Sequence, residues 1–421
     1  MLMSKGQNSI VPQLRFPEFE SYGDWNIDKF SSFIKLYRGS SPRPISQFLT
    51  KDENGVNWIK IGDTKNAVGF EISKVEEKIT TEGSKKSRKV KKGELILANS
   101  MSYGATYELK IEGCIYDGWF VLREYEDSFD KQFLLQLLNS DFLQIQYKRL
   151  AAGGIVQNIS SEIVYNTLLP KFSIKEQQKI AACLSSLDEV INAETEKLEL
   201  LQDHKKGLLQ QLFPQEGETQ PKYRFPEFIN DGDWEKRTLG DEDFTIIIMG
   251  SSPKSSSYNE NKKGLPLLQG NADIKNRKSK PRIYTTEVTK KCEIDDILLS
   301  VRAPVGTVAK SLHNACIGRG ISAIRVVKGN SQEFLYQWLI SFEPYWVNIS
   351  QGGTFDSVNS SDIKSLKIFL PKNPKEQQKI ADCLSAADDL IEAQSQKIED
   401  LQFHKKGLLQ QLFPNVNEVA V

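Results

Sequence analysis

The sequence has few of the residues on which enzymes usually depend. It contains no GxxxxGK[ST] phosphate loop and no NPPF/DPPY-type tetrad of the kind that positions an amine for methylation. Its three histidines, His204, His313 and His404, have no neighbours at metal-ligand or catalytic-triad spacing. We therefore expect no catalytic residue, no metal site and no cofactor.

Ligand-spaced cysteines, long apolar runs and an excess of one charge are also lacking. The five cysteines show no CxxC spacing, and Cys183 and Cys383 occupy equivalent apolar positions of a repeated segment, which favours reduced core thiols. The N-terminus has no apolar signal region, and no apolar run is long enough to span a bilayer. Lys plus Arg and Asp plus Glu number 55 each, so the net charge is zero and gives no overall attraction to nucleic acid or membrane. We expect a soluble, cytoplasmic protein without membrane contacts.

What the sequence does contain is a long internal repeat. Residues 175–214 recur in register as residues 375–414, and both copies begin with KEQQKIA and end with HKKGLLQQLFP. RFPEF followed by GDW precedes each copy, at residues 15–25 and 224–234. The segments between these signatures have diverged strongly. A constant frame with two different modules suits a protein that recognises two different targets at a fixed separation.

The repeated segment predicts one long helix in each copy. Apolar residues recur at alternating spacings of three and four, polar residues interrupt them at matching places, and Pro214 and Pro414 end the segments. A helix of about 39 residues is roughly 58 Å long. Each apolar stripe could pack on its own domain, but a heptad sustained in both copies favours a mutual coiled coil. The expected seam consists of Leu187, Ile191, Glu194, Leu198, Leu201, Lys205, Leu208 and Leu212 in the first helix, and of Ile391, Gln394, Ile398, Leu401, Lys405, Leu408 and Leu412 in the second.

A pseudo-two-fold relation between the copies makes the two helices antiparallel, because the first leaves its module and the second must return. Matching polar residues across the seam avoids burying a charge against an apolar side chain. The predicted register pairs Glu194 with Lys405, Lys205 with Gln394, Leu198 with Leu401 and Leu201 with Ile398. Apolar residues beyond this overlap should pack on the modules, namely Ile180, Leu184, Ile380 and Leu384.

Two glycines, Gly207 and Gly407, lie inside the helical pattern. Glycine in a helix costs about 1 kcal/mol relative to alanine. Their repetition indicates close backbone contact, either with the other helix or with a partner protein.

The two modules, residues 15–170 and 224–371, show the short β-branched and aromatic runs of a mixed α/β fold, separated by Gly, Ser, Asn and Pro. Strands are expected at residues 56–61, 94–98, 115–122, 296–301 and 321–327, and helices near 131–147 and 332–349. The fold class is α+β, with two mixed α/β domains separated by two long antiparallel coiled-coil helices in a pseudo-two-fold internal repeat. The expected segments are the first domain (1–174), the first spacer helix (175–214), the second domain (215–374), and the second spacer helix with its tail (375–421).

Corresponding loops of the two modules have different polar residues at their tips. The GSSP loops match at residues 39–42 and 250–253, and residues 116–119 (YDGW) align with 317–320 (IGRG). Such loops suit contacts with base edges, since Arg or Lys pairs with guanine and Asn or Gln with adenine. Ordinary turns have the same composition, so for any single loop that interpretation stays equally open.

Both modules also contain a basic cluster before a comparable strand. Residues 85–92 include six Lys or Arg, and residues 275–282 include five. Each cluster alone would more often be a solvated edge. Two of them in modules built for the same task make phosphate contact an equally good interpretation.

Several motifs together resemble the specificity (S) subunit of type I restriction–modification systems. They are RFPEF…GDW, DILLSVRAPVG at residues 296–306, CIGRGISAI at 316–324, LPK before KEQQKIA, and HKKGLLQQLFP, and they cover nearly the whole chain. The resemblance implies two target-recognition domains that each bind half of a bipartite, asymmetric sequence in double-stranded DNA, with a helical spacer fixing the gap. It also implies docking of two methyltransferase (modification) subunits, which supply the catalysis, and association with restriction/translocase subunits where these exist.

Loop position and side-chain chemistry select the candidate DNA-contacting residues. In the first module they are Arg38, Lys60, Asn99, Ser102, Tyr103 and Trp119. In the second module they are Gln269, Asn271, Arg302, Arg319, Thr354 and Phe355. A coiled-coil scaffold joining two protein-binding modules would also explain the repeat, although it would not require divergent polar loops beside basic clusters. A self-contained nuclease or methyltransferase is disfavoured by the missing motifs.

Overall fold

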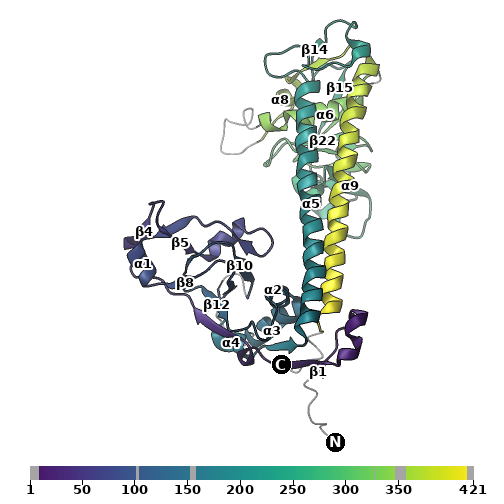
Figure 1. The fold of residues 1–421 in the computed structure, drawn as a ribbon. Helices are drawn as coiled ribbons and strands as arrows, with labels where there is room; N and C mark the ends of the chain where they lie inside the picture. Colours follow the sequence, from purple (N-terminus) through teal and green to yellow (C-terminus); the bar gives the residue numbers. More distant parts are fainter. Residues whose placement is uncertain (1–8, 101–103, 152–157, 328, 347–356, 415–421) are drawn as a thin grey trace, which may run out of the picture. The chain divides into compact units, whose positions relative to one another are not determined.

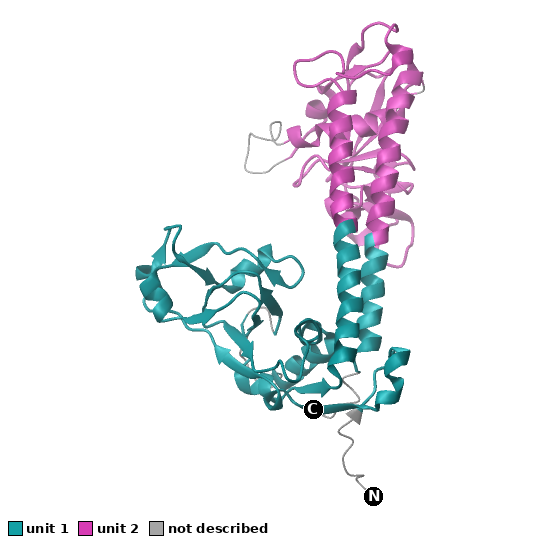
Figure 2. Ribbon diagram, viewed as in Figure 1, with its two compact units in different colours: residues 1–193, 398–421 teal, residues 194–397 magenta. Residues whose placement is uncertain are grey.

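The computed structural model describes residues 9–100, 104–151, 158–327, 329–346 and 357–414. The chain divides into two compact units, one made of residues 1–193 and 398–421 and the other of residues 194–397 (Figure 2). Each unit contains one α/β module and part of each long helix. Because this division cuts through both long helices, it does not test the four segment boundaries, which remain a prediction.

The first module is built on three small sheets. At its base, β2 (Trp25–Lys29) pairs antiparallel with β1 (Ser9–Ile10) and β13 (Leu168–Lys171). A five-stranded sheet of order β3-β12-β9-β10-β6 consists of β3 (Lys35–Arg38), β12 (Trp119–Arg123), β9 (Leu95–Ala98), β10 (Thr106–Leu109) and β6 (Glu71–Ile72). A second, of order β4-β7-β5-β11-β8, consists of β4 (Leu49–Thr50), β7 (Glu77–Ile79), β5 (Val56–Ile59), β11 (Gly113–Ile115) and β8 (Arg88–Val90).

The helices of the first module are α1 (Thr81–Lys85), α2 (Lys131–Asn139), α3 (Asp141–Ala151) and α4 (Ser161–Asn166). The side chain of Asp130 caps α2 by accepting a hydrogen bond from the Phe133 amide at 3.0 Å. Ser140 is extended (φ −72°, ψ 158°) and separates α2 from α3. The single helix predicted near 131–147 is therefore two helices.

The second module repeats this plan although its sequence has diverged. Here β14 (Glu235–Thr238) pairs with β26 (Lys367–Leu370). The larger sheet, of order β15-β25-β22-β23-β19-β18, consists of β15 (Thr245–Met249), β25 (Ile321–Val326), β22 (Ile297–Ser300), β23 (Val308–Lys310), β19 (Lys278–Ser279) and β18 (Ile274–Lys275). The other, of order β16-β20-β17-β24-β21, consists of β16 (Tyr258–Asn259), β20 (Ile283–Thr285), β17 (Leu265–Leu268), β24 (Ala315–Ile317) and β21 (Lys291–Cys292). Among the described residues of this module, the α-helices are α6 (Gln332–Phe342) and α8 (Ser360–Lys364).

Most of the predicted strands are confirmed. Those expected at 56–61, 94–98, 296–301 and 321–327 are β5, β9, β22 and β25. The strand expected at 115–122 is instead the end of β11 and the start of β12, separated by a short turn in which the Trp119 amide donates to the Tyr116 carbonyl at 3.2 Å. That turn connects two different sheets, so the chain changes sheet where a continuous strand was expected.

The two long helices are α5 (Ile174–Leu212) and α9 (Pro374–Leu412), each of 39 residues, and they lie side by side (Figure 1). In each unit the start of one helix and the end of the other enter the core of the module. Ile180 and Leu184 cluster with Leu412 and Phe413 in the first unit, as do Ile380 and Leu384 with Leu212 and Phe213 in the second. The helices are therefore antiparallel, and the predicted α+β fold with coiled-coil helices is confirmed.

The register of the coiled coil differs from the predicted one. Gln394 Nε2 donates to the Glu194 carboxylate at 2.6 Å, and Lys397 pairs with the same carboxylate at 2.6 Å. Lys205 is paired with Asp388 at 2.5 Å, and Lys405 with Asp188. The predicted pairs Glu194–Lys405 and Lys205–Gln394 are therefore wrong. The predicted pairs Leu198–Leu401 and Leu201–Ile398 belong to the same register and are wrong as well. The two aspartates flank the apolar seam, so a comparison limited to seam residues missed them.

Each of these lysine–aspartate pairs is also bound to its module by a glutamine. Gln337 of α6 donates to Asp388 at 2.8 Å in the second unit, and Gln136 of α2 donates to Asp188 at 3.3 Å in the first. Burial lowers the pKa of Lys205 from its ordinary value, against the opposing effect of Asp388. One polar cluster thus sets the helix register and the attachment of the module together.

The opening signature of each copy binds the start of its helix. Arg15 contacts the Glu176 carboxylate at 2.7 and 2.9 Å, and the indole Nε1 of Trp25 donates to the same carboxylate at 3.2 Å. In the second unit, Arg224 contacts Glu376 at 2.7 and 2.8 Å, and Trp234 donates at 3.2 Å. RFPEF, GDW and KEQQ recur together in the sequence because they form one contact in the structure.

Candidate nucleic-acid interface

Three loops of the first module meet where β3 and β9 end and β12 begins. The Gly39 amide donates to the Trp119 carbonyl at 2.8 Å, and the Asn99 amide donates to the Gly118 carbonyl at 2.9 Å. A Cβ on Gly39 would lie 1.9 Å from the Tyr116 carbonyl oxygen, so only glycine permits this approach. The loops therefore form a rigid support for residues 116–118, which we call the first tip.

Two candidate residues of the first module hold this tip. Arg38 Nε and Asn99 Nδ2 both donate to the backbone carbonyl of Asp117, at 3.2 and 3.0 Å. Arg38 is exposed, whereas Asn99 is buried, so Asn99 positions the tip from beneath. Both side chains also line an open hollow of about 590 Å³ with Asn158, Ser160 and Ser161. The structure thus brings Arg38 and Asn99 together at the first tip, and their contact with DNA stays a prediction.

The Asp117 side chain has a defined ionisation state. The hydroxyl of Ser41, from the GSSP loop, donates to its carboxylate. This hydrogen bond, with the nearby charges of Arg38 and Arg43, lowers the pKa of Asp117 below its ordinary value despite partial burial. At neutral pH Asp117 is a carboxylate and can only accept hydrogen bonds.

The second module has the same loop framework. The Gly250 amide donates to the Ile321 carbonyl at 3.0 Å, as Gly39 does to Trp119, and Val301 donates to Gly320 at 3.0 Å, as Asn99 does to Gly118. We call residues 318–320 the second tip. Because Trp119 matches Ile321 and Gly118 matches Gly320, the alignment of 116–119 with 317–320 is displaced by one residue.

The corrected equivalence places opposite charges at the same point of the two modules. Asp117 of the first tip corresponds to Arg319 of the second. Arg319 is exposed, and its backbone amide donates to the hydroxyl of Ser252 at 3.1 Å, whereas the equivalent hydroxyl of Ser41 donates to the side chain of Asp117. The sequence analysis did not select Asp117; the GSSP repeat and the register of β12 and β25 would have identified it.

The remaining candidates are placed differently. Arg302 is exposed and forms a β-bridge with Ser357 beside the second tip. Lys60 pairs with Glu77 at 2.5 Å, and Gln269 Nε2 donates to the Tyr258 hydroxyl at 3.0 Å. Asn271 Oδ1 is buried and has no hydrogen-bond partner among the described residues. The other four lie outside the described residues: Ser102, Tyr103, Thr354 and Phe355.

Trp119 does not belong to the interface. Its side chain is 0 % exposed and packs with Ile96 and Val121 in the core between the sheets. A buried side chain cannot contact a base, so this prediction is wrong and Trp119 has a packing role. An aromatic residue beside a loop motif gave no indication of which face of β12 it would occupy.

Comparison with known proteins decides the family. The profile described as "Type I restriction modification DNA specificity domain" matches residues 22–202 and 231–402, one match for each copy of the repeat. The chain belongs to the type I restriction–modification specificity subunits. A putative type I restriction enzyme specificity subunit, MjaX of Methanocaldococcus jannaschii, is 31% identical over 407 residues, which cover 92% of each chain. The MjaVIII specificity subunit of the same organism is 23% identical over 421 residues, covering 94% of this chain and 92% of its own.

Solved structures agree with this membership. A chain from a study of complex assembly and conformational transition of the type I R-M system has a TM-score of 0.64 and 25% identity, covering 93% of this chain and 98% of its own. The S subunit from M. genitalium shares the fold, with a TM-score of 0.58, 16% identity and coverage of 96% and 100%. As a specificity subunit, the chain is the non-catalytic DNA-recognition component of its system.

Within the described residues, no helix is long and apolar enough to cross a membrane. The same residues contain no group of three or more His, Cys, Asp or Glu arranged to hold a metal ion.

Proposed function

We propose that this specificity subunit recognises a bipartite, asymmetric target in double-stranded DNA, with one half bound by each module. The observation on which the proposal rests is the pair of matched tips, Asp117 and Arg319, held by the same backbone contacts and bearing opposite charges. Equal frames with unequal tips are expected where two related modules contact two different sequences.

The chemistry of the two tips favours different bases. An aspartate accepts a hydrogen bond from an exocyclic amino group, such as cytosine N4, whereas an arginine donates two hydrogen bonds to guanine O6 and N7. Arg302, exposed beside the second tip, adds a further donor to that module. We therefore assign Arg38 and Asp117 to one half-site and Arg302 and Arg319 to the other, with the phosphate contacts determining orientation.

We further propose that α5 and α9 set the gap between the half-sites and bind two methyltransferase subunits. A Cβ at Gly207 or Gly407 would meet no atom of the described residues within 4 Å, so close contact of these glycines with the other helix, one of the two predicted alternatives, is wrong. The alternative, contact with a partner protein, is supported by large exposed apolar side chains on the same helices, of which Phe403 is 79% and Leu200 69% exposed. Restriction subunits would join through those partners.

The test is the methylation pattern of genomic DNA from cells with and without this gene, measured by single-molecule sequencing. A motif of two short specified halves around an unspecified gap should be present and should disappear in the deletion strain. The Arg302→Ala variant should then relax base preference in one half only. An equal loss of binding on all sequences would instead make Arg302 a phosphate contact. Absence of any motif, together with failure to bind random duplex DNA, would favour a protein scaffold.

A further inference from the structure

Six cationic side chains line one hollow of about 420 Å³ in the first module. Its walls are Ser40, Lys85, Lys86, Ser87, Arg88, Lys89, Lys91 and Arg123. We propose that this basic hollow binds the phosphate backbone of duplex DNA next to the first tip, and that the second module has no equivalent anchor. The proposal deepens the proposed DNA-binding function and rests on it.

The hollow is built into the frame that supports the tip. It is formed mainly by the end of α1 and by β8, which is one of the two edge strands of its sheet. The Ser40 hydroxyl, from the GSSP loop, donates to the Lys86 carbonyl at 3.4 Å, and Arg88 Nε donates to the Arg38 carbonyl at 3.2 Å. A strand of DNA whose base contacts the tip would therefore have neighbouring phosphates near these cations.

Most of the positive charge in the hollow is not neutralised. Lys85 pairs with Glu82 at 2.7 Å, on the surface, and Arg123 pairs with Glu94 at 2.7 Å. Lys86, Lys89 and Lys91 form no ion pair with another described residue. Two carboxylates against six cations leave a net charge suited to a polyanion.

Aromatic rings orient several of the cations without neutralising them. Lys86 Nζ lies 4.7 Å from the centroid of the Phe48 ring, and the guanidinium carbons of Arg88 and Arg123 each lie 5.6 Å from that of Tyr37. Tyr37 thus holds two guanidinium groups together. Side chains that are already positioned lose less conformational entropy when a phosphate binds.

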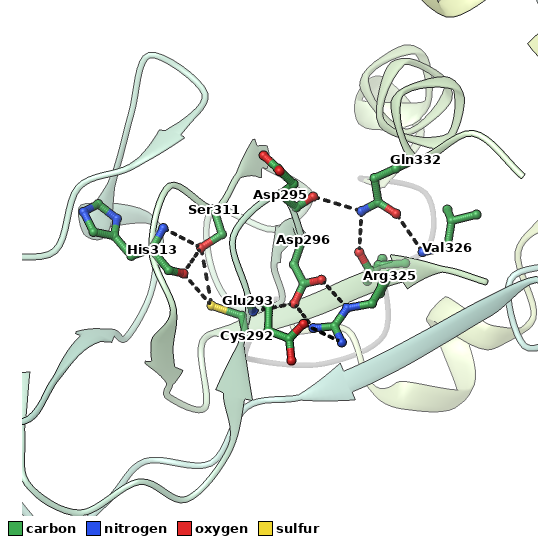
Figure 3. A network of polar contacts seen from close by, with 10 residues as sticks. Cys292, Glu293, Asp295, Asp296, Ser311, His313, Arg325, Val326 and Gln332 are labelled. Atoms are coloured by element: carbon green, nitrogen blue, oxygen red, sulfur yellow. Dashed lines mark hydrogen bonds and ion pairs between the residues drawn. The ribbon is translucent and has the colours of Figure 1, made fainter. Parts of the chain in front are cut away.

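At the equivalent place in the second module, the arginine is neutralised by ion pairs (Figure 3). In the strand register, Lys89 lies opposite Cys114 in the first module, and Lys291 lies opposite Cys316 in the second, so the two lysines correspond. Two residues further on, the Lys91 amide donates to Glu94 at 2.7 Å and the Glu293 amide donates to Asp296 at 2.7 Å. Lys91 of the first module is therefore Glu293 in the second.

This exchange reverses the charge at the site. Arg325, which corresponds to Arg123, contacts Asp296 at 2.7 Å and Glu293 at 3.0 Å (Figure 3). One arginine between two carboxylates has no charge left for a phosphate. The contacts of Arg325 with Asp296 and Glu293 in Figure 3 thus neutralise the charge at the place that corresponds to the basic hollow.

The basic cluster at 275–282 does not replace it. This cluster lies on and after β18 and β19, in the larger sheet, whereas the cluster at 85–92 lies on β8 in the other sheet. Arg277 pairs with Glu343 at 2.7 Å, Lys278 with Glu392 at 2.5 Å, and Arg282 with Asp273 at 2.9 Å. The two clusters therefore do not occupy the equivalent positions that the sequence suggested, and phosphate contact by residues 275–282 stays a prediction.

The experiment is duplex binding by the full-length subunit, purified with its partner subunits, measured between about 50 and 200 mM salt. One variant combines Lys86→Gln, Lys89→Gln and Lys91→Gln. The matched control combines Lys290→Gln and Lys291→Gln in the second module, and both are checked for native circular dichroism. Target and random duplexes are compared, with ATP as a mononucleotide competitor.

The triple variant should weaken binding to target and random duplexes equally, by about tenfold at low salt, and reduce the slope of log K against log [salt] by about 2 to 3. The control should leave the slope unchanged. An unchanged slope in the triple variant, a loss confined to one base position, an equal loss in the control, or displacement of duplex by equimolar ATP would each overturn the inference. If the wild-type complex bound no duplex, the proposed function would fail instead.

Discussion

The two modules are alike where they attach to the long helices and differ at their tips. At the attachment sites, Arg15–Glu176 and Arg224–Glu376 have the same 2.7 Å contact, and each carboxylate accepts a hydrogen bond from a tryptophan N–H at 3.2 Å. At the tips, the same backbone hydrogen bonds support a carboxylate in one module and a guanidinium in the other. The repeated motifs are those that attach a module to its helix, whereas the residues proposed to contact DNA are not repeated.

The largest expected effect follows from disrupting the attachment of one module to its helix while leaving that of the other module intact. Glu176 is 1% exposed, and Arg15 and Trp25 both depend on it. Glu176→Ala should lower the free energy of unfolding of the first unit by about 3 to 5 kcal/mol, because it leaves a desolvated guanidinium and an indole N–H without their acceptor. Glu376→Ala should cause the same loss in the second unit. Denaturant unfolding followed by hydrogen exchange in each unit measures both.

A surface ion pair at the same junction provides the control. Glu18 and Lys179 are 3.2 Å apart with about half of each side chain exposed. Glu18→Ala should change the free energy of unfolding far less than Glu176→Ala does, because solvent screens an exposed ion pair. If Glu176→Ala destabilised the first unit no more than Glu18→Ala does, the buried contact would not hold the module. If only one of the two units depended on its buried glutamate, the two attachment sites would not be equivalent.

The two kinds of region also differ in how far the sequence alone predicted them. Regular spacing identified both long helices to within two residues, since a sustained heptad pattern of apolar residues with a terminal proline has one good interpretation. The helix register was not predictable in this way, because Asp188 and Asp388 lie outside the stripe and their partners Gln136 and Gln337 come from the modules. Only the fold places those side chains together.

The tips show the same limit. Glycine and serine located the loops, but an alignment without strand register was displaced by one residue and separated Asp117 from Arg319. Trp119 was selected by type, whereas its role depends on which face of β12 it occupies. The backbone hydrogen bonds from Gly39 and Gly250 settle the alignment, and the packing of Trp119 against Ile96 and Val121 settles its role. Neither is visible in the sequence.

The next largest effect on stability is expected at the lysine–aspartate pairs of the coiled coil. Lys205 is 7% exposed, and its ammonium pairs with Asp388. Lys205→Ala should lower the free energy of unfolding of the second unit by about 2 kcal/mol, less than a fully buried pair because Asp388 keeps some contact with solvent. Lys405→Ala, in the first unit, is the matched variant.

Lys205 also predicts a dependence on pH. Burial lowers its pKa in the folded chain, so between that value and the ordinary value of 10.5 the unfolded chain binds more protons. The contribution of Lys205 to the free energy of unfolding should therefore rise with pH in this alkaline window. The difference between wild type and Lys205→Ala, measured by denaturant unfolding from pH 7 upward, should grow accordingly; a difference that shrank would contradict the burial argument.

An effect of similar size, on sequence choice and not on stability, is expected when the charge of a tip is removed. Asp117→Asn keeps the size of the side chain but adds donors, so it should change preference at one base position of one half-site by about 1 to 3 kcal/mol. Arg319→Gln should do the same in the other half-site. Methylation motifs of the two variants would show this directly. A change in both halves from either variant would mean that the modules are not independent.

The smallest effect concerns the open glycines of the helices. No atom of the part of the chain that the structure describes lies within 4 Å of a Cβ at Gly207 or Gly407. Gly207→Ala should therefore raise the free energy of unfolding of the isolated subunit by up to about 1 kcal/mol through helix propensity alone. If a partner approaches the backbone here, the same substitution should weaken assembly with the methyltransferase subunit, measured by titration of one into the other. Gain of stability with unchanged assembly would place the docking surface elsewhere on the helices. Gain of stability with weaker assembly would show that glycine is kept at this position for the partner, at the expense of the helix.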